Sequence, residues 1–129
     1  MRSIAATRGV TPEKNEVIVK EIRGYEVART YPLPLRNDLA KHAPVFDWGF
    51  FGEAPKQLAL AILVVAVGEV AALEYYVEFA EKIISRQPYH GFTFGMSSIR
   101  NWVDAAAARR HAQRRRKMQK GRKYNANYD

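Results

Sequence analysis

The sequence predicts a single α+β domain, in which a small antiparallel sheet packs against two or three helices and a basic helix or tail projects at the C-terminus. Three observations lead to this prediction. The chain has 129 residues, enough for one compact core. A β-branched segment and an alternating segment, expected to form an N-terminal hairpin, precede three segments with helical patterning. The excess positive charge lies in residues 105–129.

The N-terminal part is expected to contain the hairpin. Residues 1–15 have no clear hydrophobic period and are expected to form an extended N-terminal segment. Residues 16–22 are rich in β-branched side chains, which favours a strand. Arg23-Gly24 suits a tight turn into a second strand over residues 25–31, and two strands joined by a short turn form a hairpin.

Apolar patterning predicts two central helices. Pro55 suits the first position of a helix, and residues 56–67 are apolar nearly all round, which indicates a buried helix. Gly68 interrupts this pattern. Residues 69–86 then repeat apolar side chains at helical spacing, and Pro88 prevents further continuation. This second helix is expected to be amphipathic.

A short strand and a long helix are expected in the C-terminal part. Residues 91–94 suit a strand that pairs with the hairpin, and Ser97 or Ser98 can cap the following helix. The apolar face of that helix covers its first two turns, which are expected to dock on the body. Residues 105–120 contain no Gly, Pro or β-branched residue, so the helix is expected to project as a rod until Gly121.

Charge divides the chain into two parts. Residues 105–129 contain nine Lys and Arg and one acid, whereas residues 1–104 contain twelve of each sign. The predicted organisation is therefore a neutral globular domain, residues 1–104, and a cationic arm, residues 105–129. Such a dense cationic run suits a line of phosphates, and its excess of Arg over Lys favours forked phosphate contacts. The candidate nucleic-acid-binding residues are Arg109, Arg110, Arg114, Arg115, Arg116, Lys117, Lys120, Arg122, Lys123 and Tyr124.

The neutral domain carries a motif around its first helix. Residues 46–50 are Phe-Asp-Trp-Gly-Phe, and residues 57–63 are Gln-Leu-Ala-Leu-Ala-Ile-Leu. They resemble an uncharacterised family of prokaryotic and phage proteins in which Trp-Gly-Tyr-Gly-Gly precedes Gly-Pro-Ala-Gln-Leu-Ala-Leu-Ala. The resemblance covers about residues 25–104 and implies a shared fold without a known activity. The chain departs from the motif at Phe51 and Glu53, which puts any ligand of that loop in doubt.

The glycine-containing loop before the first helix is a second candidate site. Backbone N–H groups at the start of a helix suit an anion, and Trp48, Gly49, Gly52, Lys56 and Gln57 are the possible ligand contacts. The loop matches neither a Walker motif nor a dinucleotide fingerprint. The alternative interpretation is structural: the glycines allow a turn, and Trp48 covers the buried helix.

No pattern in the sequence predicts an enzyme, a metal site or a cofactor. The chain has no cysteine, which excludes disulfides and thiolate chemistry. Its histidines lack metal-binding spacing, and His42 is expected to anchor its loop by hydrogen bonds with Asp38 or Asp47. No nucleophile elbow surrounds the serines at 97 and 98. The acids of the second helix are expected to form a solvated face: Glu74, Glu78 and Glu81.

The sequence therefore predicts a non-enzymatic, cytoplasmic RNA-binding accessory protein. Most concretely, it would be a ribosomal or ribosome-associated protein, whose arm neutralises rRNA phosphates and whose body can touch neighbouring ribosomal proteins. Two alternatives stay open: a small-ligand or nucleotide-binding module that uses loop residues 48–57, and a DNA-binding virion or nucleoid protein. No membrane partner is expected, because the longest apolar run, residues 58–67, is too short to span a bilayer and no signal peptide is evident.

Overall fold

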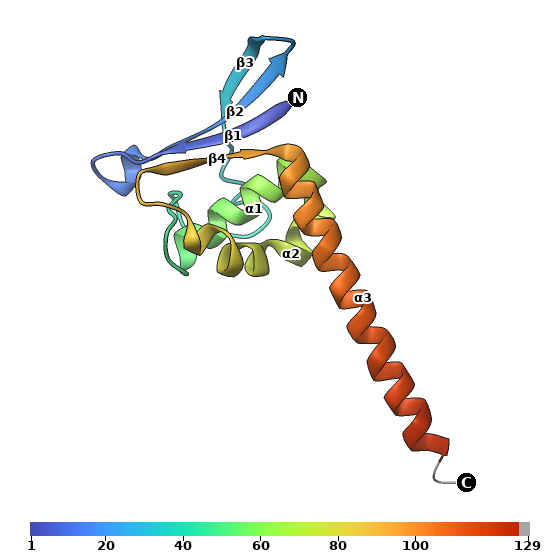
Figure 1. Cartoon of the computed structure of the whole chain (residues 1–129). Coiled ribbons are helices and arrows are strands. Elements are labelled where there is room, and N and C mark those ends of the chain that lie inside the picture. Colours follow the sequence, from blue (N-terminus) through green and yellow to red (C-terminus); the bar gives the residue numbers. More distant parts are fainter. Residues whose placement is uncertain (127–129) are drawn as a thin grey trace.

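A four-stranded antiparallel sheet and three helices form the α+β fold that the sequence predicts (Figure 1). The computed structural model describes the backbone of residues 1–126 and the side chains of residues 1–120. The sheet has the order β3-β2-β1-β4, and its strands are β1 (Arg2–Thr7), β2 (Glu16–Arg23), β3 (Glu26–Pro32) and β4 (Gly91–Gly95). The helices are α1 (Glu53–Val67), α2 (Glu69–Lys82) and α3 (Met96–Ala126).

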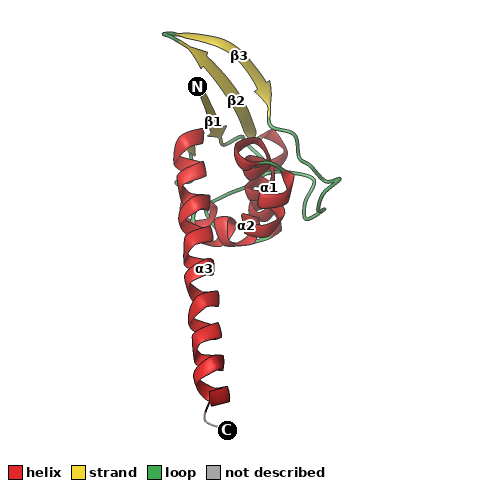
Figure 2. Ribbon diagram, turned by 90° about the vertical axis from the view of Figure 1, so that its right-hand side faces the viewer, coloured by secondary structure: helices red, strands yellow, loops and turns green. Residues whose placement is uncertain are grey.

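The helices lie on one face of the sheet, and α3 extends far beyond the body (Figure 2). Side chains alternate between the two faces of a strand, and the buried ones mark the inner face. In β1 and β2, Ile4 lies opposite Val19 and Ala6 lies opposite Val17, and all four side chains are buried. Residues 58–63 of α1 are fully buried, so α1 lies at the centre of the core, as predicted.

The hairpin of β2 and β3 is confirmed, and the segment expected to be extended at the N-terminus contains a further strand that the sequence did not predict. Residues 2–7 form β1, which pairs with both β2 and β4. The predicted pairing of residues 91–94 with the hairpin is wrong, because β1 lies between them. Four of the six residues of β1 are buried or half-buried small or polar side chains, which give little contrast between its faces.

The ends of the first two helices differ from the prediction. α1 begins at Glu53, so Pro55 occupies its third position, where a backbone N–H would have no helical partner in any case. α2 ends at Lys82, and a separate 3₁₀ turn follows over Ile84–Arg86. Between α1 and α2, Gly68 has a φ of 89°, in the region that favours glycine.

The third helix is longer than predicted at both ends. α3 begins at Met96, so Ser97 and Ser98 lie inside its first turn rather than before it. It also continues through Gly121 to Ala126, because a single glycine costs a helix only about 1 kcal/mol. The docked part exceeds two turns, since buried residues recur along it: Met96, Ile99, Val103 and Ala106. Within the described residues, no helix has the length and apolar composition needed to cross a bilayer.

Candidate nucleic-acid interface

The docked half of α3, residues 96–110, ends in a polar contact with α2. Arg110 Nη2 donates to Glu78 Oε2 at 3.1 Å, and Arg110 Nη1 donates to the backbone oxygen of Glu74 at 3.1 Å. The same guanidinium lies over the ring of Tyr75, 4.2 Å from its centroid. Arg109 Nη2 lies 3.5 Å from Glu78 Oε1. Two of the cations expected at phosphates, Arg109 and Arg110, are therefore engaged by α2.

Glu78 is the centre of this contact. Burial acts to raise the pKa of its carboxyl group, but hydrogen bonds from Lys82, Arg110 and Arg109 outweigh burial and lower that pKa. Glu78 therefore stays ionised at neutral pH. The solvated face expected for α2 is wrong for Glu78, which is half-buried and pairs with Arg110. Glu74 stays exposed, with a carboxylate oxygen 3.7 Å from Arg110, and Glu81 is exposed and has no ion pair among the described side chains.

Beyond Arg110, α3 leaves the body and becomes the free segment, residues 111–126. Every side chain from residue 111 to residue 120 is exposed. No acid occurs between Asp104 and Asp129, and none of the cations at 114–120 forms an ion pair with a described side chain. These cations are Arg114, Arg115, Arg116, Lys117 and Lys120.

The free segment is cationic on all sides. Successive residues of an α-helix point about 100° apart, so Arg114, Arg115 and Arg116 face three different directions. At about 1.5 Å per residue, the segment is a rod about 24 Å long. The side chains of three further predicted binding residues lie outside the described ones: Arg122, Lys123 and Tyr124.

The polar groups of the candidate ligand loop are used within the chain. Gln57 is fully buried, and its Oε1 accepts from the backbone N–H of His42 at 2.8 Å. Its Nε2 donates to the backbone oxygen of Leu35 at 2.5 Å. Lys56 Nζ lies 3.3 Å from Glu53 Oε1. This geometry favours a structural role for both side chains.

Each glycine of this loop has a backbone role: Gly49 allows the turn, and Gly52 leads the chain into α1. Gly49 has a φ of 87°, and its N–H donates to the backbone oxygen of Ile84 at 3.0 Å. Gly52 directly precedes α1, and its carbonyl accepts from the N–H of Lys56 at 3.1 Å. Both backbones are therefore tied to helical elements of the body.

Trp48 lies in the core, and an unexpected arginine holds it there. The indole is 1% exposed and its Nε1 donates to the backbone oxygen of Pro88 at 3.0 Å. Its ring meets Phe92 edge-on, with centroids 5.5 Å apart. Arg8 lies over the indole at 4.5 Å and forms a 2.6 Å ion pair with Asp47. Arg8 follows β1, and sequence reasoning missed it because its partners lie about forty residues away.

His42 anchors its loop, as expected, but through other partners. Its Nδ1 lies 2.8 Å from Glu53 Oε2, and its Nε2 lies 2.7 Å from the hydroxyl of Tyr76. The hydrogen bond with His42 is the main reason that the pKa of Glu53 is lowered. The expected partners, Asp38 and Asp47, each pair with an arginine instead. Among the described residues, no three His, Asp or Glu side chains come together as metal ligands.

Comparison with known protein families identifies the relatives of the body. The model of DUF6166, a family of unknown function, matches residues 9–105. The chain belongs to this family. The DUF6166 match confirms the resemblance to an uncharacterised domain family, and it ends before Arg109, so the free segment of α3 lies outside it. No curated protein and no solved structure shows significant similarity to the chain.

Proposed function

We propose that this member of DUF6166 is a non-enzymatic RNA-binding protein that contacts phosphates through the free segment of α3. The observation that carries the proposal is the contrast in ion pairing along that helix. Arg109 and Arg110 have acidic partners on α2, whereas the cations at 114–120 have none among the described side chains. Each phosphate that such a cation neutralises releases counterions, which favours binding to a polyanion.

The distribution of the cations favours RNA over a DNA duplex. A helix in the major groove of DNA has phosphates beside it and bases beneath it, but its outer face meets solvent. Arg114, Arg115 and Arg116 point in three directions, so a groove would leave part of their charge unmatched. Folded RNA can surround a rod of this length with phosphates.

A large RNA particle such as the ribosome is the setting that we infer. In that setting the neutral body docks by shape against RNA or neighbouring proteins, and the free segment lies between RNA helices in the cytoplasm. We also propose that the motif around Trp48 is shared with relatives of this chain in prokaryotes and phages. A ligand module at residues 48–57 has less support, because Gln57 and the Trp48 indole donate their polar hydrogens within the chain.

Fluorescence anisotropy with three labelled probes tests the proposal: a structured RNA, a DNA duplex of equal length and a mononucleotide. We expect the full-length protein to bind the RNA most tightly. Replacing Arg114, Arg115 and Arg116 together by Ala should weaken RNA binding about 100-fold near physiological salt, because three phosphate contacts are lost. Tighter binding of the duplex would favour the virion or nucleoid alternative. Mononucleotide binding that survives the triple substitution would favour the loop.

A further inference from the structure

The two edge strands of the sheet differ in their protection against further pairing. β3 carries charged side chains and a proline, Glu26, Arg29 and Pro32, and its register with β2 is irregular between Glu21 and Ile22. Charges, prolines and bulges are the means by which natural edge strands avoid pairing with other chains. β4 has the sequence Gly-Phe-Thr-Phe-Gly and carries none of them.

The outer backbone groups of β4 are available for pairing. The N–H of Arg8 donates to the carbonyl of His90, so the backbone groups of His90 point toward β1. Phe92 and Phe94 lie two and four residues further along, opposite Ala6 and Ile4, so their N–H and C=O groups also point toward β1. Amide groups alternate in direction along an antiparallel strand, so the N–H and C=O of Thr93 point outward. Within the described part of the chain, no backbone or side-chain group bonds to them.

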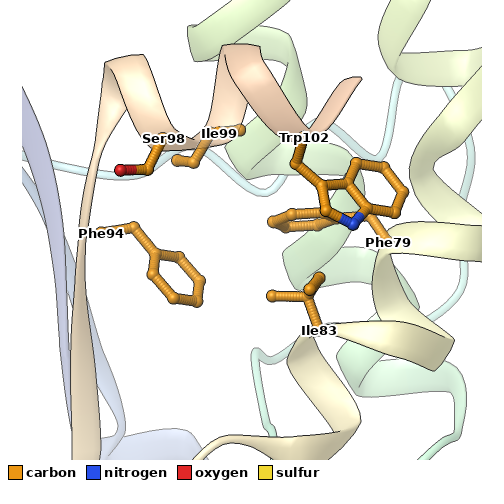
Figure 3. A pocket seen from close by; sticks show the side chains of 6 residues that line it. All are labelled: Phe79, Ile83, Phe94, Ser98, Ile99 and Trp102. Atoms are coloured by element: carbon orange, nitrogen blue, oxygen red, sulfur yellow. The ribbon is translucent and has the colours of Figure 1, made fainter. Parts of the chain in front are cut away.

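An apolar groove opens along the same edge, between the sheet and the helices (Figure 3). Its volume is about 170 Å³. The rings of Phe94, Phe79 and Trp102 face this space, and the centroids of Phe79 and Trp102 lie 5.0 Å apart. The remaining lining residues are Ile83, Ser98 and Ile99. An apolar groove beside an unprotected strand is typical of a surface that another chain covers.

The sequence of β4 is the same in both directions, and this identifies the partner. In an antiparallel pair of two such strands centred on Thr93, Phe92 of each copy lies opposite Phe94 of the other, and glycine lies opposite glycine. A two-fold interface requires this kind of self-complementary surface. We propose that β4 pairs with β4 of a second copy of this chain, so that the two sheets become continuous and the phenylalanines of each copy extend the apolar groove of the other.

Pairing through β4 would also bring two copies of α3 together. The benefit of this for polyanion binding rests on the proposed function, but the proposed dimer does not depend on it. α3 begins directly after β4, so the two copies of α3 start at opposite ends of the paired strands. Met96 lies three residues beyond Thr93 in each copy, so six residue steps of about 3.3 Å place these starts about 20 Å apart along the strands, on the same face of the sheet. Two cationic rods on one particle would bind a polyanion with avidity.

Sedimentation of the full-length protein in high salt, after nuclease treatment, tests the dimer. We expect a species of twice the 14.7-kDa chain mass. Thr93→Pro should weaken the dimer about 30-fold or more, because it removes both central N–H donors from the interface while leaving the bonds to β1. The matched variant Thr93→Val keeps these donors and should remain dimeric. A wild-type monomer at several hundred micromolar, or a folded Thr93→Pro dimer, would overturn the proposal.

A second measurement decides the question even if Thr93→Pro fails to fold. The chain has no cysteine, so Thr93→Cys introduces a single thiol. The two thiols face each other across the two-fold axis, and a short bis-maleimide should link them about tenfold faster than chance encounters allow, because their effective concentration is in the millimolar range. Thr30→Cys, at a position that is also exposed but lies on the other edge strand, is the control. Equal rates for the two variants would contradict β4 pairing.

Discussion

The two halves of α3 share one backbone geometry and have opposite surroundings. The docked half buries Ile99, Val103 and Ala106, and it ends at the ion pairs between Arg110 and Glu78. The free segment buries no described side chain and has no acidic partner among them. Packing explains why the first half is helical, whereas the second half depends on intrinsic helix propensity alone. The comparison shows that the cations of one helix divide into a structural pair and a group that is available to an outside partner.

The largest expected effect is on the stability of the body against which the docked half of α3 packs. Trp48→Ala should lower the free energy of unfolding by about 3–5 kcal/mol, because it removes a fully buried ring and leaves a cavity. Urea unfolding measures this loss. Phe50→Ala, at a half-exposed ring of the same loop, should cause no comparable loss. A Trp48 variant that keeps its stability and loses a binding partner would show that the loop is a recognition site.

A smaller effect separates the two halves of α3 directly. Arg110→Ala should lower the free energy of unfolding by about 1–2 kcal/mol, since it removes hydrogen bonds to Glu74 and Glu78 and the stacking on Tyr75. Arg115→Ala should leave the unfolding curve unchanged, because this side chain is exposed and without a described partner.

RNA binding should respond to the same two substitutions in the reverse order. Arg115→Ala should weaken it, and Arg110→Ala should leave it nearly unchanged. Equal effects of both variants on stability, or equal effects of both on binding, would remove the distinction between the docked half and the free segment.

The sequence predicts the elements whose patterns are local. The hairpin follows from a β-branched run before Gly24 and an alternating segment after it, and α1 follows from an apolar run after Pro55. β1 could not be predicted in the same way, because its alanines mark neither face and its strand character depends on pairing with β2 and β4. Strand pairing of this kind is a property of the fold rather than of the segment.

The sequence predicts which cations make up the candidate site, but it does not predict which of them are paired within the fold. The cationic run is visible in the sequence, but Arg109 and Arg110 belong to it by spacing as much as Arg114 does. Their pairing with Glu78 depends on the path of α3 across α2, which brings together residues more than thirty positions apart. The contacts of Arg8 with Asp47 depend on the fold in the same way.

The salt dependence of RNA binding tests the central claim most directly. If about six cations of the free segment meet phosphates, the logarithm of the association constant should fall with the logarithm of salt concentration at a slope of about −4 to −5. Replacing Arg114, Arg115 and Arg116 together by Ala should flatten that slope by about two to three units. Replacing the same three residues by Lys should preserve most of the slope and still lower the affinity, because forked contacts are lost. An unchanged slope after the triple Ala substitution would contradict the account, because phosphate contacts would then lie outside the free segment.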